Sequence, residues 1–382
     1  MKRRITVIFI AIFILCISLP YLLAHRDREG RSSSMENRML AAYPSVWTEG
    51  GPGPAYLSRF EAWLDDNLRG RTVLVEANST LQYQLFGRVV KSDILQGRNH
   101  WLFVKDQDMI REYQRLNLLP EDRLDLYAEK MQKISDYLER QGIAFYYFQC
   151  YSKEEIYPEQ YAAGVNRVGS AGRADQVVET LQEKTDVKQI LTKDMLLERA
   201  DELIYFQYVD SLHWNEKGSY YGYQTLMEEI GKDFGQIRSL QETDYLITEE
   251  ESSVELYGFE YPYSELCPVY KVRDPQAKEI TEQTQERWEF LHYREHTHDY
   301  VNEGCENDLR ILLVGDSFVR MFLKDDIAEG FRETLSIDWL NIPILDQVVE
   351  EYQPDIVVLE SAQSALKDTV ELVIQTEFAD AQ

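Results

Sequence analysis

The first 54 residues of the chain consist of an apolar stretch followed by a polar one. Residues 5–24 are almost uninterruptedly apolar and follow three basic residues. A helix of about 20 apolar residues is long enough to cross a bilayer, so we predict a transmembrane anchor over residues 1–24, with a cleaved signal peptide as the alternative. Residues 25–54 are rich in Arg, Ser, Gly and Pro and are predicted to form a linker.

Further along the chain, the apolar positions alternate between helical and strand spacing. An amphipathic helix is predicted to begin at Pro120 and to end before Gly142, because apolar side chains recur there every three or four residues. Continuous apolar runs predict buried strands at 144–148 and 203–206. This alternation indicates an α/β fold, and we assign residues 55–382 to one domain.

The periodic pattern is interrupted over residues 236–307, where the sequence is acidic and rich in Tyr. We interpret this segment as an insertion. Regular spacing then resumes, with predicted strands at 310–314, 335–340 and 354–359 and a predicted helix over 318–331.

Charge and cysteine content narrow the possible partners and cofactors. The net charge of −27 repels phosphate backbones, so we do not expect nucleic acid as a partner. The cysteines lack metal-ligand spacing, although Cys267 and Cys305 can close a disulfide if the domain lies outside the cytoplasm. His292, His296 and His298 lie close together in sequence, but a solvated segment is the favoured interpretation over a metal site.

A candidate nucleophile lies where the predicted strand 310–314 turns into the following helix. The sequence there is Gly315-Asp316-Ser317-Phe318. A serine at such a turn is accessible, and the N–H groups at the helix start can stabilise an oxyanion. Taken alone, these residues more often form an ordinary turn with a helix N-cap.

A candidate base follows the predicted strand 203–206. Asp210 and His213 lie three residues apart on one loop, so the carboxylate can hold one imidazole nitrogen and leave the other free. A capping Asp beside a surface His is the alternative. Because both motifs follow predicted strands, we favour Ser317, His213 and Asp210 as catalytic residues.

These motifs resemble those of the SGNH hydrolase superfamily, which has its nucleophile in a Gly-Asp-Ser block and its base in an Asp-x-x-His block. Ordinary members carry the serine block first, whereas this chain carries the histidine block first, as a circularly permuted fold would. The order is similar to that of AlgX- and AlgJ-type O-acetyltransferase-like proteins and the related DHHW proteins. Further matching segments are Glu36-Asn37-Arg38, Trp101-Leu102-Phe103, His213-Trp214-Asn215 and the strand that begins at Pro354.

The resemblance implies a parallel sheet flanked by helices and an extracytoplasmic enzyme that transfers an acyl group, most simply acetyl, to a polysaccharide. Ser317 would form the acyl-enzyme, with His213 as the base and Asp210 orienting it. A membrane-bound multipass acyltransferase is implied as the source of the acyl group. No cofactor is implied.

Three residues beside the motifs are expected to contact substrate. Gln363 stands where the superfamily has an oxyanion-hole Asn, and Asp316 and Trp214 adjoin the nucleophile and the base. Two alternatives to the transferase remain: a carbohydrate esterase with the same three residues, and a non-catalytic surface-polymer assembly protein.

Overall fold

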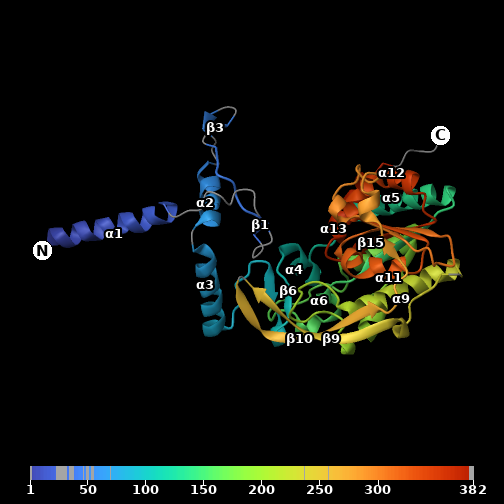
Figure 1. Cartoon of the computed structure of the whole chain (residues 1–382), viewed down its shortest axis with the longest axis horizontal. Coiled ribbons are helices and arrows are strands. Elements are labelled where there is room, and N and C mark those ends of the chain that lie inside the picture. Colours follow the sequence, from blue (N-terminus) through green and yellow to red (C-terminus); the bar gives the residue numbers. More distant parts are fainter. Residues whose placement is uncertain are drawn as a thin grey trace. The chain divides into compact units, whose positions relative to one another are not determined.

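The chain divides into two compact units, which are described separately below (Figure 1). The first unit contains residues 1–92 and 253–262, and the second contains 93–252 and 263–382. The predicted domain over residues 55–382 therefore begins within the first unit. This computed structural model describes residues 2–22, 32–33, 38–45, 47–48, 51–52, 56–68, 70–235, 237–256 and 258–377.

Among the described residues, a seven-stranded sheet forms the centre of the second unit, in the order β11-β12-β14-β13-β15-β7-β8. The strands from β14 to β8 are parallel, and β12 pairs antiparallel with both β14 and β11. This mostly parallel sheet confirms the predicted α/β class. The strands are β7 (Ala144–Cys150), β8 (Lys188–Leu191), β11 (Lys278–Glu279), β12 (His298–Val301), β13 (Arg310–Gly315), β14 (Glu333–Asp338) and β15 (Ile356–Ala362).

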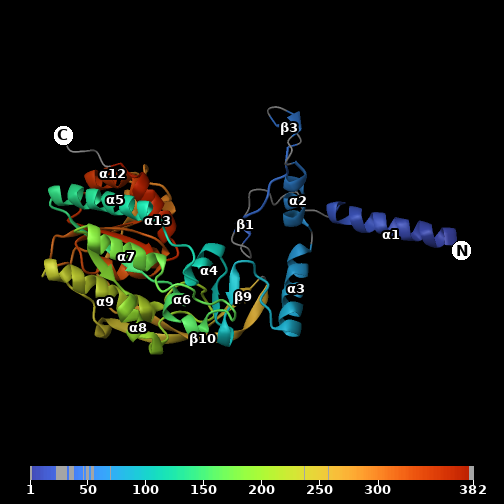
Figure 2. The ribbon, with the colours of Figure 1, turned by 180° about the vertical axis from the view of Figure 1, so that it is seen from behind.

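Helices cover both faces of this sheet, which explains why β13 and β15 are apolar at successive positions rather than at alternate ones. Figures 1 and 2 show the two layers on either side of β15. One layer contains α5 (Glu121–Arg140), α7 (Arg173–Lys184), α12 (Leu345–Tyr352) and α13 (Leu366–Gln375). The opposite layer contains α9 (Glu216–Asp233) and α11 (Lys324–Ala328), the latter preceded by a π-helical turn at Val319–Leu323.

Several predicted elements are confirmed. Pro120 caps α5, whose apolar stripe is buried, and Gly142 takes a positive φ of 77° just after the helix ends. The predicted strands at 144–148, 310–314, 335–340 and 354–359 correspond to β7, β13, β14 and β15.

The predicted strand at 203–206 is wrong. Leu203 adopts a left-handed conformation with φ of 55°, and only Tyr205 forms a bridge, to Trp214. The N–H of Ile204 donates to the hydroxyl of Tyr157 rather than to a neighbouring strand. Ile204 and Tyr205 are nevertheless fully buried. The apolar run therefore reflects burial in the core, without a strand being formed.

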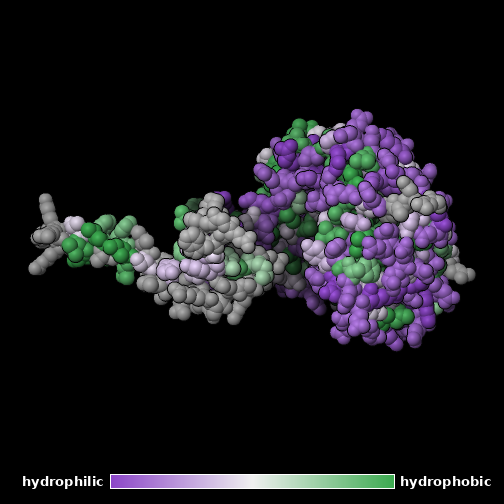
Figure 3. All heavy atoms as spheres, turned by 90° about the horizontal axis from the view of Figure 1, so that it is seen from above, coloured by the Kyte–Doolittle hydropathy of each residue, from purple (hydrophilic) through white to green (hydrophobic). Residues whose placement is uncertain are grey.

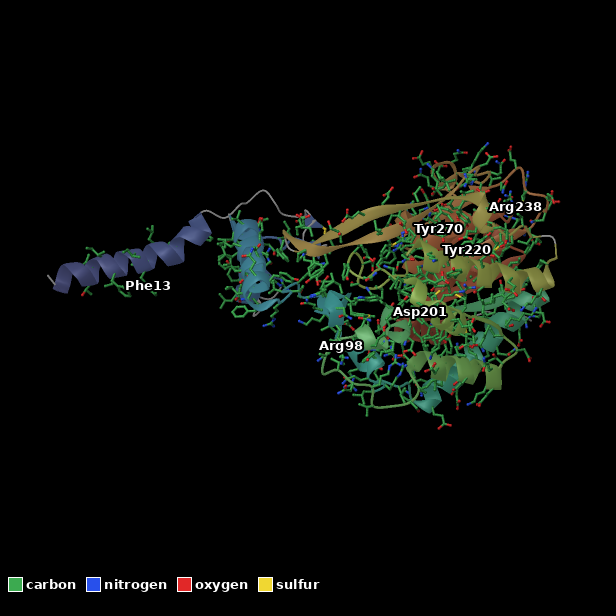
Figure 4. The ribbon with its side chains drawn as sticks, turned by 90° about the horizontal axis from the view of Figure 1, so that it is seen from below. Phe13, Arg98, Asp201, Tyr220, Arg238 and Tyr270 are labelled. Carbon is green, nitrogen blue, oxygen red and sulfur yellow. The ribbon has the colours of Figure 1, made fainter. Side chains whose placement is uncertain are left out.

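The segment 236–307, predicted as an insertion, contributes two strands to the central sheet and also forms a separate hairpin. Gln236, its first residue, lies outside the described residues. Strands β9 (Tyr245–Leu256) and β10 (Phe259–Val272) form a two-stranded sheet, whereas β11 and β12 extend one edge of the central sheet. Figure 4 shows Tyr270 of β10 beside Tyr220 of α9, with ring centroids 5.5 Å apart, so the base of the hairpin packs on that helix.

Shorter elements complete the second unit. The antiparallel pair β5 (Ile94–Gln96) and β6 (Leu102–Val104) precedes α4 (Gln107–Tyr113). The remaining helices are α6 (Lys153–Ile156), α8 (Lys193–Glu198) and α10 (Thr281–Thr284).

The first unit contains α1 (Lys2–Leu22), α2 (Tyr56–Asn67) and α3 (Arg71–Phe86), together with the strand pairs β1 (Ser32–Ser33) with β2 (Arg38–Met39) and β3 (Trp47–Thr48) with β4 (Gly51–Pro52). Apolar side chains such as Phe9 and Phe13 are exposed on α1, which is largely green in Figure 3. Within the described part of the chain, no helix meets the length and apolarity needed to cross a membrane. The anchor over 1–24 stays a prediction, and much of the predicted linker over 25–54 lies outside the described residues.

The disulfide considered for Cys267 and Cys305 is not formed. Cys150, Cys267 and Cys305 are free thiols. Cys305 directs its Sγ to the carbonyl oxygen of Gly330 at 3.5 Å, whereas Cys267 is buried on β10.

Two glycines of α9 provide a matched test of packing near the candidate base. A Cβ at Gly218 would lie 2.2 Å from the carbonyl oxygen of Ile204, whereas a Cβ at Gly231 meets nothing within 4 Å. We predict that Gly218→Ala lowers the free energy of unfolding by ~1–3 kcal/mol because of the overlap. Gly231→Ala should leave it unchanged or raise it by up to ~1 kcal/mol. Urea unfolding followed by near-UV circular dichroism measures both, and equal effects would contradict the packing.

Candidate active site

The turn that carries Ser317 is held in place by the side chain of Asp316. Strand β13 ends at Gly315, and helical structure begins at Ser317. Asp316 accepts hydrogen bonds from the N–H groups of Phe318 (2.9 Å) and Ala362 (3.1 Å), so it joins the helix start to the end of β15. Asp316 is buried, and these contacts make it a structural residue of the turn; its predicted contact with substrate stays a prediction.

A second buried carboxyl group, that of Glu360, lies beneath this turn. Its Oε2 accepts the N–H of Asp316 at 2.9 Å, and a Cβ at Gly315 would lie only 2.8 Å from the same oxygen. Burial, together with the charge of Asp316, raises the pKa of Glu360 well above its usual value. Burial thus favours the neutral form of Glu360, which disfavours two negative charges side by side beneath the turn.

The structure brings together the three residues predicted as nucleophile, base and acid. Nε2 of His213 lies 2.7 Å from Oγ of Ser317, and Nδ1 lies 2.8 Å from Oδ2 of Asp210. These contacts form one continuous chain of hydrogen bonds from Asp210 to Ser317. Residues from two distant parts of the chain meet here because the carboxyl end of β13 and the loop before α9 lie at the same edge of the sheet.

The electrostatics of Asp210 suit a partner for an imidazolium. Burial by itself would raise the pKa of Asp210, but the hydrogen bond from His213 and its positive charge outweigh burial. Backbone N–H groups of His213 (2.9 Å) and Leu212 (2.7 Å) also donate to Oδ1. Together they lower the pKa of Asp210 to about 2, so the carboxylate is ionised at neutral pH.

Aromatic rings fix the imidazole from the side of the nucleophile helix. The His213 ring lies 5.0 Å from that of Phe318 and 5.5 Å from that of Phe322. Trp214 packs edge-on against Phe318 at 4.9 Å and has no exposed surface. The expected contact of Trp214 with substrate is therefore not supported, and its role is to pack the base against the helix.

The loop that carries Asp210 lacks regular secondary structure and is held by the hairpin. Glu265 of β10 accepts hydrogen bonds from three consecutive backbone N–H groups, those of Gln207 (2.7 Å), Tyr208 (2.8 Å) and Val209 (2.8 Å). A carboxylate that accepts three N–H groups fixes the backbone immediately before Asp210.

Lys153 binds a backbone carbonyl group of the same loop. Its Nζ donates to the carbonyl oxygens of Asp210 (2.7 Å) and Leu102 (2.6 Å) and lies over the rings of Trp101 and Phe103. Burial lowers the pKa of Lys153 to about 7 despite the nearby carboxylates. Sequence analysis missed Lys153 and Glu265, because neither lies in a motif and both reach the loop through tertiary contacts.

Gln363, expected as an oxyanion-hole donor, is buried and hydrogen-bonded to other protein groups. Its amide nitrogen donates to Oε1 of Glu112 (3.1 Å), and its amide oxygen accepts the N–H of Ser152 (3.2 Å). With its side chain buried and its amide committed to these partners, Gln363 joins β15 to β7 instead. The N–H of Ser317 remains as a donor, because the first N–H groups of a helix have no intrahelical acceptor.

The histidines at 292, 296 and 298 do not converge on a common ligand position. Nδ1 of His296 lies 2.7 Å from Asp338, whereas Nδ1 of His298 lies 2.8 Å from Glu279. Throughout the described ranges, no group of three or more His, Cys, Asp or Glu side chains is arranged to hold a metal ion.

Comparison with known families decides the affiliation of the chain. The family described as the SGNH hydrolase-like domain of the acetyltransferase AlgX matches residues 94–336. The chain belongs to this family. The predicted resemblance to AlgX-type acetyltransferases is thus confirmed, and the match includes both the Asp210–His213 loop and Ser317.

Several solved structures are similar to this chain at low sequence identity. PatB1 of Bacillus cereus is 17% identical, with 72% of this chain and 96% of that chain covered and a TM-score of 0.54. A DHHW family protein of Eubacterium siraeum is 13% identical, with 76% and 100% covered and a TM-score of 0.49. The O-acetyltransferase domain of Pseudomonas putida AlgJ is 14% identical, with 76% and 95% covered and a TM-score of 0.45. Among curated proteins, no match to this chain was found.

The lowered pKa of Asp210 predicts a pH-dependent contribution to stability. A carboxyl group whose pKa falls from about 3.9 in the unfolded chain to about 2 in the folded one stabilises the protein by ~2 kcal/mol above pH 4, and this contribution disappears as the pH falls from about 4 to about 2. Asp210→Asn should therefore lower the free energy of unfolding at pH 6, and the deficit should shrink by pH 3. Urea titrations at several pH values measure this difference in the free energy of unfolding. Asp201→Asn, at an exposed position, is the control. A deficit that does not change with pH would contradict the assigned ion pair.

Proposed function

We propose that this protein is an extracytoplasmic O-acyltransferase that transfers an acyl group, most simply acetyl, to a polysaccharide hydroxyl. The observation that carries the proposal is the hydrogen-bonded chain Asp210–His213–Ser317 in a member of the AlgX family. A serine hydrogen-bonded to an imidazole whose other nitrogen contacts a buried carboxylate is the arrangement needed for acyl transfer.

In the first half-reaction, Oγ of Ser317 attacks the carbonyl carbon of the acyl donor. Nε2 of His213 accepts the proton of Oγ at the 2.7 Å contact, and ionised Asp210 stabilises the imidazolium that forms. The N–H of Ser317, at the helix start, supports the negative charge on the carbonyl oxygen. Collapse of this intermediate breaks the bond to the donor's leaving oxygen, which takes the proton from His213, and leaves Ser317 acylated.

In the second half-reaction, a sugar hydroxyl replaces the leaving group. His213 accepts the hydroxyl proton while the sugar oxygen attacks the acyl-enzyme, and the proton then returns to Oγ of Ser317 as the ester bond to the enzyme breaks. The acyl group passes from one oxygen to another with no change in oxidation state. The enzyme emerges in its starting protonation state.

The location and the acyl donor are further parts of the proposal. We place the catalytic unit outside the cytoplasmic membrane, attached through the N-terminal segment, because exposed apolar side chains follow one another along α1. A membrane-bound multipass acyltransferase would then supply the acyl group. The acidic net charge of the chain disfavours phosphate-rich partners and agrees with a carbohydrate acceptor.

A carbohydrate esterase is the second candidate, because the same hydrogen-bonded residues serve both reactions. Transfer and hydrolysis differ only in whether a sugar hydroxyl or water attacks the acyl-enzyme. The product formed when both are present therefore distinguishes them.

Replacement of Ser317 by Ala should abolish acyl transfer. The purified full-length chain is incubated with 4-nitrophenyl acetate and a mixture of cellopentaose, chitopentaose and pentagalacturonate, and acetylated sugars are measured by mass spectrometry. We expect Ser317→Ala to lower the rate by a factor on the order of 10³ or more, because the acyl-enzyme cannot form. Ser264→Ala, on the exposed surface of the hairpin, serves as the control and should retain activity. Acetate without acetylated sugar in the wild type would favour the esterase, and unchanged turnover in Ser317→Ala would exclude both.

Glu265 should influence kcat although it lies outside the hydrogen-bonded chain. Glu265→Gln replaces one accepting oxygen by an NH₂ group, so at least one of the three loop N–H groups loses its partner. We predict a fall in kcat of about tenfold, corresponding to ~1–2 kcal/mol, with KM for the acyl donor unchanged. Glu251→Gln, which alters an exposed carboxylate on the other strand of the hairpin, is the matched control. A loss of folding in Glu265→Gln without a kcat effect on the folded fraction would refute the positioning role.

A further inference from the structure

Three partly exposed side chains gather around Asp338, at the strand ends that carry the nucleophile. They are Tyr293, with 52% of the residue exposed, and His296 and Arg320, with 32% and 26% of the side chain exposed, and are called here the Tyr–His–Arg patch. Arg320 follows Ser317 by three residues on the same helical segment, and its backbone N–H donates to the carbonyl oxygen of Asp316 at 3.0 Å. Phe318 and Phe322 of that segment pack against the ring of His213.

Asp338 anchors the patch to the sheet edge that carries the nucleophile. It is the last residue of β14 and pairs in register with Gly315, two residues before Ser317. Its buried Oδ2 lies 2.7 Å from Nδ1 of His296 and accepts a hydrogen bond from Nη1 of Arg320 at 3.3 Å. One buried carboxylate thus orients both polar side chains of the patch.

Asn341 fixes the backbone of the loop that carries the patch. This residue is fully buried, and its side chain accepts the N–H of His292 (2.7 Å) while donating to the carbonyl oxygens of His292 (3.1 Å) and Asp338 (2.9 Å). Tyr293, which follows His292, has a φ of 53°, a left-handed backbone conformation that is uncommon for residues other than glycine. The loop is therefore built to hold Tyr293 at the surface.

The chemistry of the patch matches that of a sugar ring. The Tyr293 ring is stacked with that of His296, with an interplanar angle of 16° and centroids 5.9 Å apart, so the imidazole holds the half-exposed Tyr293 ring in place. The contact of Nδ1 with Asp338 leaves Nε2 of His296 available for a hydrogen bond with a sugar hydroxyl group, and Arg320 supplies donors. Aromatic faces pack against the C–H face of a pyranose while flanking polar groups bind its hydroxyls.

We infer that the Tyr–His–Arg patch binds a pyranose ring of the glycan acceptor and directs a neighbouring hydroxyl to acylated Ser317. This inference rests on the proposed function and identifies where that function receives its acceptor. Arg320 and Asp338 join the patch to the helical segment and the strand end that carry Ser317, so a sugar bound there lies near the nucleophile. Such a subsite favours the sugar hydroxyl over water in the second half-reaction.

Binding is tested without catalysis by isothermal titration of full-length Ser317→Ala protein with cellopentaose, chitopentaose and pentagalacturonate separately. We expect at least one pentasaccharide to bind, and we expect Tyr293→Ala or Arg320→Gln in this background to weaken that binding about tenfold or more. Tyr293→Phe keeps the ring and should bind as before, and Arg238→Gln, which alters an exposed arginine elsewhere in the second unit (Figure 4), is the control for charge. Binding of none of the three sugars, or equal binding by Tyr293→Ala, would overturn the inference.

A kinetic measurement on protein that retains Ser317 separates this inference from the proposed function. Tyr293→Ala should leave the burst of 4-nitrophenol from 4-nitrophenyl acetate unchanged, while the ratio of acetylated sugar to free acetate falls about tenfold. A burst that falls in parallel would overturn the inference, because the patch would then serve the donor step. If the pentasaccharide binds through Tyr293 but the wild type acetylates no sugar, the patch stands and the proposed transferase fails.

Discussion

The hydrogen bond between His213 and Ser317 depends on how firmly an irregular loop is held against the end of a sheet. The nucleophile is placed by regular structure, because β13 and the helix after it fix Ser317. The base has no such support: residues 207–213 form neither helix nor strand. Tertiary contacts must therefore supply the rigidity that a hydrogen-bond chain with 2.7 and 2.8 Å contacts requires.

Two buried charged side chains of opposite sign provide this rigidity. Glu265 binds the loop's N–H groups and Lys153 binds one of its carbonyls, so each charge satisfies backbone groups that would otherwise be buried without partners. The lowered pKa of Lys153 shows that its burial is costly, and the rings of Trp101 and Phe103 offset part of that cost. The Trp101-Leu102-Phe103 segment, which belongs to the family resemblance, thus supports the Asp210 loop through Lys153.

The sequence predicted the site better than it predicted the surroundings of the site. Ser317, His213 and Asp210 were identifiable because each lies in a short local motif after an apolar run. The burial of Trp214 and Gln363 was not predictable in this way, because whether a side chain faces substrate or the core depends on distant partners such as Phe318 and Glu112. The strand expected at 203–206 failed for the same reason: an apolar run indicates burial, and strand pairing is a separate condition.

The reversed order of the two motifs follows from the arrangement of the sheet. Strand β15, from the C-terminal part of the chain, lies between β13 and β7, so strands that precede and follow the central segment interlock in one sheet. The carboxyl ends of parallel strands meet at one edge whatever their order along the chain. A loop after β8 and a turn after β13 can therefore meet at that edge whether the histidine or the serine is synthesised first. What this arrangement does require is a contact that ties the two segments together, and in this chain Phe318 and Phe322 supply it by packing against His213 and Trp214.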